Sequence, residues 1–278
     1  MLQNGRDCCL PKITVKDFDL EHTLFCGQLF RVYKEKGWCC VAVRDRVFKV
    51  RQDSDQLEYH GVDKDFMTHF FALDESYPAI LKQISRDIHT RNAIKRYYGL
   101  RIVRQDPWEC VISFLCSSAS NIPKIKLNLE KLSQLFGERI EIKGFKGYSF
   151  PNPGDLHDYE RILQAKTGFR AKYIKAANEL VHEKFLLSLT NLPYLEAKTA
   201  LKKIPGIGDK IADCILLFSL GFTEAFPIDT WIKKILQRYY FENAEVSNKK
   251  LHAFGVEYFG RYAGYAQQFL YMSARMQK

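Results

Sequence analysis

The chain has 278 residues, of which 46% are hydrophobic and 27% are charged. This length and composition allow a sizeable buried core and predict two domains. The formal net charge is +10, which favours a polyanionic partner such as a nucleic acid. No apolar run approaches the roughly 20 residues that span a bilayer, so we expect no membrane-spanning helix.

Residues 1–95 are predicted to form an antiparallel sheet domain with flanking helices, and residues 96–278 a mostly helical domain. Short apolar runs that favour strands lie at residues 29–33, 38–43, 47–51 and 57–60. From Pro78 onward the helical period dominates, apart from a loop at residues 149–154. The expected fold class is therefore α+β.

The cysteines are scattered along the chain: Cys8, Cys9, Cys26, Cys39, Cys40, Cys110, Cys116 and Cys214. Two adjacent pairs cannot supply the spaced ligands of a zinc or iron–sulfur site. We therefore expect a reduced, intracellular protein, in the cytoplasm or nucleoid of a bacterium or in the nucleus of a eukaryote. The first residues, Met1–Asp7, lack the pattern of a signal peptide.

A helix-hairpin-helix is predicted at about residues 193–221. The first helical pattern stops at Pro205, because proline cannot continue the helical hydrogen-bond ladder. Gly206 and Gly208 then permit positive φ and expose backbone N–H groups, and a second helix begins near Asp209. Free N–H groups at a helix start, with the positive end of the helix dipole behind them, favour a phosphate. The pattern therefore predicts that this hairpin binds a DNA backbone.

Lys210 lies in the first turn of this second helix, whose other residues are apolar nearly all round. A lysine amine attacks carbon only when it is neutral, and both a helix N-terminus and apolar surroundings favour the neutral form. Asp229 precedes an amphipathic helical pattern, so it is a good N-cap. Held by backbone N–H groups, its carboxylate would stay ionised and could stabilise a developing cation.

Taken singly, Lys210 fits a solvated lysine at a helix end, and Asp229 fits a cap with no catalytic role. Together with the hairpin they indicate a DNA glycosylase that is also a lyase.

Four blocks of sequence carry a resemblance to a known family. They are Phe25-Cys-Gly-Gln-Leu-Phe-Arg31, the stretch Gly99-Leu-Arg-Ile-Val-Arg-Gln-Asp-Pro-Trp-Glu-Cys110 continuing to Ser118, the hairpin block from Leu201 to Trp231, and Gly260-Arg-Tyr-Ala-Gly-Tyr-Ala-Gln267. Over almost its whole length the chain resembles the 8-oxoguanine DNA glycosylases of the helix-hairpin-helix, Gly/Pro, Asp superfamily. The first two blocks are specific to this family, whereas the hairpin alone indicates only the superfamily.

The resemblance implies a sheet domain like the TATA-binding protein, packed on a helical helix-hairpin-helix glycosylase domain. It implies a monomeric base-excision repair enzyme that flips 8-oxoguanine out of double-stranded DNA and excises it. Lys210 would attack the sugar and form a Schiff base, Asp229 would stabilise the cation, and β-elimination would nick the strand. No metal or organic cofactor is required, although the hairpin leaves room for a structural monovalent cation.

The base pocket follows from spacing and from the resemblance. Cys214 lies four residues after Lys210, so the two side chains share one face of the helix. Gln267 and Tyr271 are likewise four residues apart. The extruded base would stack between Cys214 and Tyr271, a position that is usually Phe in the family, while Gln267 addresses its Watson–Crick edge. The carbonyl of Gly27 would accept the N7 hydrogen that 8-oxoguanine has and guanine lacks. Phe218 is placed in the same pocket.

The residues that face the opposite base depart from the family pattern. Ala119 stands where an asparagine fills the vacated stack, and Lys124 where an arginine reads the orphaned cytosine. Phe169 and Arg170 match the wedge and the second guanidinium. Trp231 stands where the family has a histidine that contacts phosphate. Together with the hairpin glycines Gly206 and Gly208, it is assigned to the DNA backbone.

Two other functions fit part of the sequence. An endonuclease III-like glycosylase for oxidised pyrimidines would share the hairpin and lysine, but it usually carries a C-terminal four-cysteine iron–sulfur loop, and no cysteine follows Cys214. The presence of Gly27 is a second argument against an endonuclease III-like enzyme. A non-catalytic hairpin module that only binds DNA would leave Lys210 and Asp229 without a role.

Overall fold

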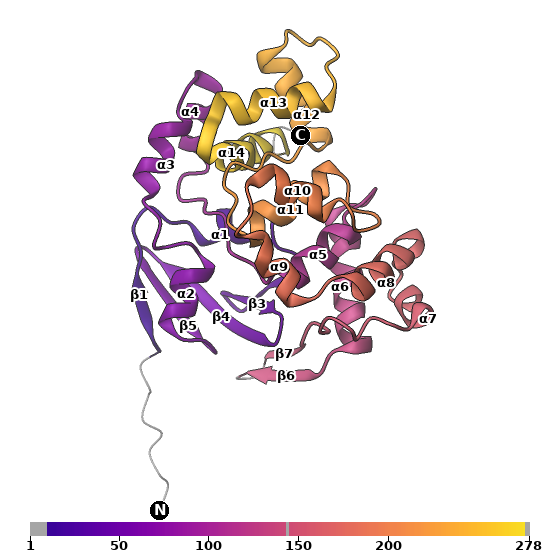
Figure 1. The fold of residues 1–278 in the computed structure, drawn as a ribbon. Coiled ribbons are helices and arrows are strands. Elements are labelled where there is room, and N and C mark those ends of the chain that lie inside the picture. The colour runs from indigo at the N-terminus through magenta and orange to yellow at the C-terminus, as the bar shows by residue number, and fades with distance from the viewer. Residues whose placement is uncertain (1–9, 143–144, 276–278) are drawn as a thin grey trace, which may run out of the picture.

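The computed structural model describes residues 10–142 and 145–275, so the interpretations of Met1–Asp7 and of Cys8 and Cys9 lie outside the described residues. An antiparallel sheet has the strand order β1-β5-β4-β3-β2. Its strands are β1 (Lys12–Thr14), β2 (Val32–Glu35), β3 (Trp38–Val43), β4 (Arg46–Asp53) and β5 (Gln56–His60). Figure 1 shows this sheet at one end of the molecule and most of the helices at the other.

The predicted strands are confirmed in three places and wrong in one. β3 has the predicted bounds, and β4 and β5 extend the predicted runs by one or two residues. The run at 29–33 is not a strand over its first half, because Leu29 packs into the core of the sheet and Phe30 into the core of the helices. The chain at this point passes between the two cores.

The helices are numbered α1 to α14 along the chain. Their bounds are α1 (Leu20–Leu24), α2 (Lys64–Phe70), α3 (Tyr77–Ile84), α4 (Ile88–Arg96), α5 (Pro107–Cys116), α6 (Ile122–Phe136), α7 (Tyr159–Gln164), α8 (Ala171–Leu180), α9 (Glu183–Leu189), α10 (Tyr194–Leu201), α11 (Asp209–Ser219), α12 (Thr230–Tyr240), α13 (Asn248–Phe259) and α14 (Ala263–Arg275), with short 3-10 helices η1 (Gly168–Arg170) and η2 (Gly260–Tyr262). The predicted α+β class is confirmed.

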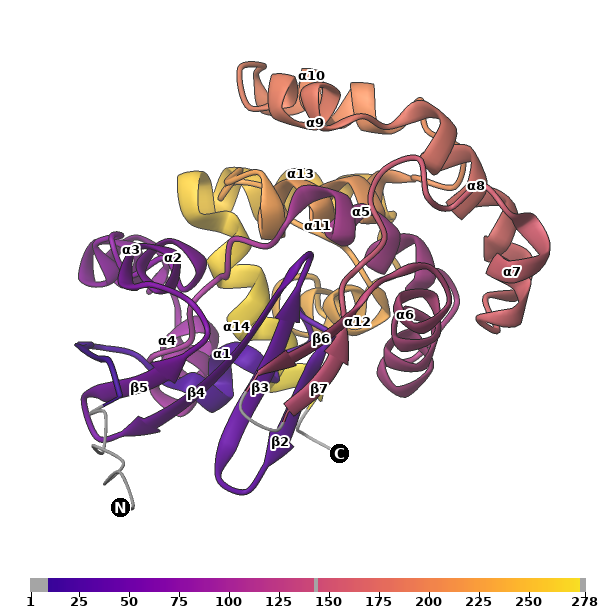
Figure 2. The same ribbon diagram turned by 90° about the horizontal axis from the view of Figure 1, so that it is seen from below.

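The helical half also contains a hairpin that the sequence pattern did not predict. It is formed by β6 (Arg139–Ile142) and β7 (Phe145–Tyr148). The hairpin lies against β3 and β4 of the main sheet, as the view from below also shows (Figure 2). It therefore extends the contact between the sheet and the helices.

Two hydrophobic cores hold the fold. The smaller one joins the sheet to α2 through aromatic rings, with Phe48 meeting Phe70 at 5.4 Å between ring centroids. The larger one joins the helices, including α3 and α4. Val103 packs into the smaller core and Cys26 into the larger one, so the chain crosses between them more than once. The domain boundary at residue 95 stays a prediction.

A buried ion pair fastens the sheet to α5. Arg31, next to β2, donates to the Glu109 carboxylate at 3.2 Å, and the two side chains are 1% and 7% exposed. The second Glu109 oxygen accepts the backbone N–H of Arg44 at 2.6 Å, and Arg31 also donates to the carbonyl of Tyr148 in β7. Burial raises the pKa of the Glu109 carboxyl, while the charge of Arg31 opposes that rise. The pair thus joins the sheet, α5 and the β6–β7 hairpin.

We predict that Glu109→Gln lowers the free energy of unfolding by about 3–5 kcal/mol, because it leaves the buried Arg31 charge uncompensated. Equilibrium urea denaturation measures this. The exposed Glu138→Gln is the matched control and should change stability by less than about 0.5 kcal/mol. Equal stabilities of the two variants would show that the ion pair does not fasten the domains.

Candidate active site

The hairpin between α10 and α11 has the predicted form with two corrections. α10 ends at Leu201, four residues before Pro205, so the proline does not itself stop the helix. Gly206 has φ +88°, and a Cβ there would lie 2.6 Å from the ring of Tyr173, so only glycine fits. Gly208 has φ −94°, which any residue adopts; it caps α11 in open space. Its lack of a side chain leaves room for close approach by a ligand.

The Lys210 amine lies against α5. It donates to the Ser117 hydroxyl at 3.2 Å and stands 5.1 Å from the centroid of the Phe114 ring. Phe114 in turn stacks on Phe218 at 5.5 Å, so Phe218 supports the aromatic ring beside the amine. No role for Ser117 or Phe114 was predicted from the sequence. Their only signal was their place in the family block that ends at Ser118.

The Cys214 thiol lies one turn along α11 from Lys210, whose amine donates a hydrogen bond to it. Burial raises the pKa of Cys214 to about 12, and the positive charge of Lys210 offsets only part of that rise. The sulfur is therefore a neutral, polarisable surface at the predicted position of the base. This agrees with a stacking role.

Asp229 is the N-cap of α12, as predicted, and accepts the backbone N–H of Ile232 at 2.7 Å. Its pKa is raised, because the cost of burial exceeds the effect of the backbone hydrogen bonds and of the nearby Lys210 charge. The cap alone therefore does not hold the carboxylate ionised as firmly as the sequence suggested. The charges of Asp229 and Lys210 do interact across the site.

Gly27 and Tyr271 are brought together although they are far apart in the sequence. A Cβ on Gly27 would lie 3.2 Å from the Tyr271 hydroxyl, and its φ of +88° also favours glycine. Burial raises the pKa of Tyr271 to about 12. Gln267, one turn earlier on α14, is 4% exposed, and its Oε1 has no hydrogen-bond partner. An unpaired buried amide oxygen is the feature expected of a group that awaits a ligand.

The segment predicted to face the opposite base is held by Arg170. Its guanidinium donates to the carbonyls of Ser118 at 2.7 Å, Ala119 at 2.8 Å and Thr167 at 3.2 Å. Three of its five N–H groups are therefore used on the backbone. Ala119 has φ +45°, a conformation in which asparagine is far more common than alanine.

Other predicted DNA contacts lie at the surface near these elements. Phe169 is 53% exposed beside Arg170, as a wedge should be. Lys124 lies in the first turn of α6, and its backbone N–H bonds the Asn121 cap. Trp231 is half-buried in the first turn of α12, and its backbone N–H bonds the Asp229 carboxylate.

A second carboxylate, Asp213, points away from Lys210. It accepts a hydrogen bond from Tyr194 at 2.6 Å and from Lys198 at 2.8 Å, and His252 lies 3.3 Å from it. These partners belong to α10 and α13, so Asp213 ties the hairpin together. It does not compete with Asp229 for the catalytic role.

The described parts of the chain contain no cluster of three or more His, Cys, Asp or Glu side chains that could hold a metal ion. Within the same residues no helix is both long and apolar enough to cross a bilayer.

The chain is similar to known proteins that act on DNA. A family model described as 8-oxoguanine DNA glycosylase, N-terminal domain, matches residues 11–111. The structure of the Clostridium acetobutylicum 8-oxoguanine glycosylase/lyase, bound to duplex DNA with cytosine opposite 8-oxoG, is 32% identical, covers 95% of this chain and 97% of its own, and has a TM-score of 0.89. The chain belongs to the 8-oxoguanine DNA glycosylase/lyase family.

The match covers different shares of the length of two other relatives. The N-glycosylase/DNA lyase of Arabidopsis thaliana is 38% identical over 63% of this chain, and the match spans about half of the plant protein, 52%. The probable N-glycosylase/DNA lyase of Methanothermobacter thermautotrophicus is 28% identical over 95% of this chain and 96% of its own length.

We predict that Asp229→Asn slows single-turnover base excision by on the order of 10²-fold or more, because the charge that faces the cation is lost. Stability should stay within about 1 kcal/mol, since asparagine caps a helix as well as aspartate does. Because the pKa of Asp229 is raised, its contribution to stability is present at low pH and is lost as the pH rises through that pKa.

Excision by the wild type should fall as the pH is lowered through the raised pKa, and the variant should lack this acid limb. Melting temperature and excision rate, each measured against pH, separate the two roles. A variant that melts earlier but excises normally would make Asp229 only a cap.

Proposed function

We propose that Lys210 and Asp229 carry out the glycosylase and lyase activity that this chain shares with its family. The observation that supports this most strongly is the position of the Lys210 amine. It lies at the start of a buried helix, directly after the glycine hairpin, and it interacts with the charge of Asp229 and with the Cys214 thiol. An amine, a carboxylate and a base-stacking surface therefore meet at one phosphate-binding hairpin.

The proposed reaction proceeds in two stages. The neutral Lys210 amine forms a bond to C1′ of the flipped nucleotide while the N-glycosidic bond breaks, and the base leaves with the bonding electrons and takes up a proton. Asp229 stabilises the positive charge that develops on the sugar. The sugar ring opens to a Schiff base on Lys210, and loss of the C2′ proton then breaks the C3′–O bond and nicks the strand.

The choice of 8-oxoguanine is assigned to Gly27 and Gln267. The carbonyl of Gly27 accepts the N7 hydrogen of the lesion, while guanine would set one acceptor against another, at a cost of roughly 1–3 kcal/mol. Gln267, whose buried amide oxygen is unpaired, addresses the Watson–Crick edge. The enzyme is proposed to act as a monomer. The cysteines at Cys26 and beyond are free, which supports an intracellular location.

We predict that Lys210→Gln abolishes both base release and the adduct trapped by borohydride, while binding to 8-oxoguanine duplex is retained. Gel analysis of the trapped complex measures this. Lys249→Gln, an exposed lysine on α13, is the matched control and should trap normally. Normal trapping by Lys210→Gln would move the nucleophile to another residue.

We propose that the enzyme discriminates only weakly between the bases that can lie opposite the lesion. Arginine presents a fork of donors to cytosine that the point charge of Lys124 cannot reproduce. Ala119 offers no amide, and Arg170 has already committed three donors to the backbone. Each bidentate contact is worth roughly 1–3 kcal/mol of discrimination.

We therefore predict that excision opposite cytosine exceeds excision opposite adenine by a smaller factor in the wild type than in Ala119→Asn with Lys124→Arg. The asparagine should be tolerated because residue 119 already has positive φ. Single-turnover excision opposite each of the four bases measures both proteins. A wild type as strict for cytosine as the double variant would overturn the assignment.

A further inference from the structure

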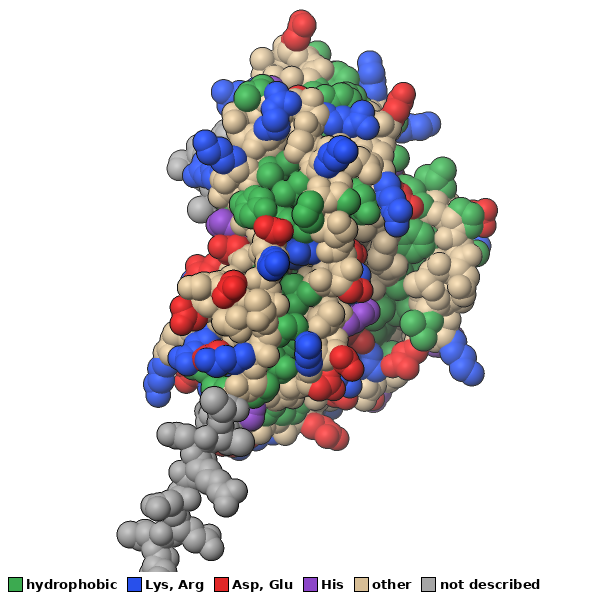
Figure 3. Space-filling model, turned by 90° about the vertical axis from the view of Figure 1, so that its left-hand side faces the viewer, with side chains coloured by type: hydrophobic (Ala, Val, Ile, Leu, Met, Phe, Trp, Pro, Cys, Tyr) green, Lys and Arg blue, Asp and Glu red, His purple; other side chains and the backbone are tan. Residues whose placement is uncertain are grey.

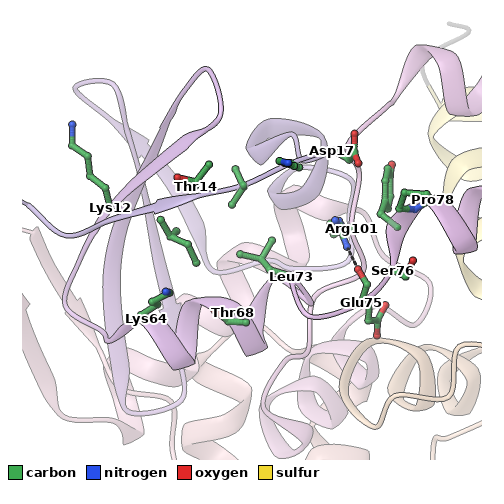
Figure 4. Close-up of a pocket in the computed structure, with 14 residues that line it drawn as sticks. Lys12, Thr14, Asp17, Lys64, Thr68, Leu73, Glu75, Ser76, Pro78 and Arg101 are labelled. Atoms are coloured by element: carbon green, nitrogen blue, oxygen red, sulfur yellow. Dashed lines mark hydrogen bonds between the residues drawn. The ribbon is translucent and has the colours of Figure 1, made fainter.

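Arg101 and Glu75, in the cavity beside β1, are committed to the fold. The cavity has a volume of about 570 Å³ and is lined by residues 12–17, Lys64, Thr68, Leu73, residues 75–78 and Arg101 (Figure 4). Arg101 donates to two backbone carbonyls between α2 and α3, and the Glu75 carboxylate accepts from Arg104 and Tyr265, each at 2.9 Å. Acidic and basic side chains are interspersed over the sheet domain on this side of the molecule (Figure 3). The Lys210 amine is held in a different way.

Neutral acceptors hold the Lys210 amine. It donates to the Ser117 hydroxyl at 3.2 Å and to the Cys214 thiol. Among the residues that the structure describes, no carboxylate forms an ion pair or hydrogen bond with it. Lys198 on α10, by contrast, forms an ion pair with the Asp213 carboxylate at 2.8 Å. A carboxylate favours a charged ammonium, whereas a neutral oxygen or sulfur also accepts a hydrogen bond from the neutral amine that the attack requires.

The Ser117 hydroxyl has already committed its own proton. Ser117 is the C-cap of α5, and its Oγ donates to the Phe114 carbonyl at 2.7 Å. A hydroxyl has one proton and two lone pairs, so the oxygen can only accept from Lys210. The ring of the same Phe114 stands 5.1 Å from the amine and stacks on Phe218 of α11. One residue of α5 therefore fixes the serine through its carbonyl and bounds the amine through its ring.

These contacts leave one direction for the lone pair of the amine. A neutral amine carries two N–H groups and one lone pair, arranged tetrahedrally with its carbon around the nitrogen. Ser117 and Cys214 take the two N–H groups, so the lone pair is directed away from both. A nucleophile whose lone pair already has a fixed direction loses less orientational freedom on the way to the transition state.

We propose that Ser117 is a positioning residue for the excision reaction, which orients the lone pair of Lys210 for attack on C1′ by accepting one of its N–H groups. The inference rests on the proposed role of Lys210 as the nucleophile. Ser117 itself forms no bond to the substrate and moves no proton. Its effect therefore belongs to each step in which the amine attacks C1′, namely base excision and Schiff base formation at a preformed abasic site.

The test compares Ser117→Ala, which removes the acceptor, with Ser117→Thr, which keeps it, because a threonine hydroxyl can also bond the carbonyl three residues earlier. Ser117→Ala should slow single-turnover excision of 8-oxoguanine about tenfold, the size expected for one hydrogen bond to the attacking group. Ser117→Thr should stay within about threefold of the wild type.

Ser188→Ala is the matched control. The Ser188 hydroxyl also donates to the carbonyl three residues earlier at 2.7 Å, and Ser188 lies exposed on α9. This variant should excise at the wild-type rate. Melting temperature and affinity for the 8-oxoguanine duplex, measured by fluorescence anisotropy, should be the same for Ser117→Ala and Ser188→Ala.

A duplex with a preformed abasic site separates positioning of the amine from recognition of the base. Borohydride trapping at that site needs attack by Lys210 but no base in the pocket. Ser117→Ala should therefore slow trapping by the same factor as it slows excision.

Excision by Ser117→Ala at the wild-type rate or faster would overturn the positioning role, and so would an equal loss in Ser117→Thr. Slow excision with normal trapping at the abasic site would also overturn it, because the defect would then lie in base recognition. Lys210→Gln, measured in parallel, tests the nucleophile itself. Normal trapping by that variant contradicts the proposed function, whereas absent trapping together with an unaffected Ser117→Ala contradicts only the role of Ser117.

Discussion

The active site depends on one constraint, which is that α11 is apolar nearly all round and must be enclosed. Residues 211–218 are all buried, and α14 approaches so closely that a Cβ on Gly264 would lie 2.2 Å from Leu217. Only the first turn of such a helix can reach the surface. That turn carries Lys210, directly after the hairpin glycines. Burial of the helix therefore sets both the N–H groups proposed to bind phosphate and the proposed nucleophile at the boundary between core and solvent.

Much of the sequence that identifies the family supports the fold and takes no part in the chemistry. The amide of Gln28 bonds the carbonyls of Thr23 and Arg101 at 2.9 and 2.8 Å and accepts the N–H of Val103 at 3.0 Å. Arg31 and Glu109, from two different blocks, form the buried ion pair. A buried polar group needs a partner of fixed chemistry and geometry, because leaving it unpaired costs more than the bond contributes. This requirement explains why these positions are so specific, although Gln28, Arg31 and Glu109 form no hydrogen bond with Lys210.

The fold class, the hairpin and the Asp229 cap could be predicted because each rests on local patterns: apolar period, proline and glycine positions, and a capping residue before a helix. β1 escaped prediction because three residues give too short an alternation, and the β6–β7 hairpin because it lies among helical patterns. Ser117 and the bonds of Arg170 could not be predicted either. They depend on how α5, α11 and η1 pack, and no local signal carries that information.

The raised pKa of Asp229 also bears on how the enzyme distinguishes its transition state from its ground state. In the free enzyme the half-buried Asp229 carboxylate interacts with the charge of Lys210, and the stabilisation it receives does not offset its desolvation. In the proposed mechanism, a positive charge that develops on the sugar adds a further favourable interaction with this carboxylate, whose orientation the cap bond to Ile232 fixes. The carboxylate thus gains more in the transition state than in the free site, and only such a difference accelerates the chemical step. A strongly solvated or fully paired aspartate at this position would gain less additional stabilisation in the transition state.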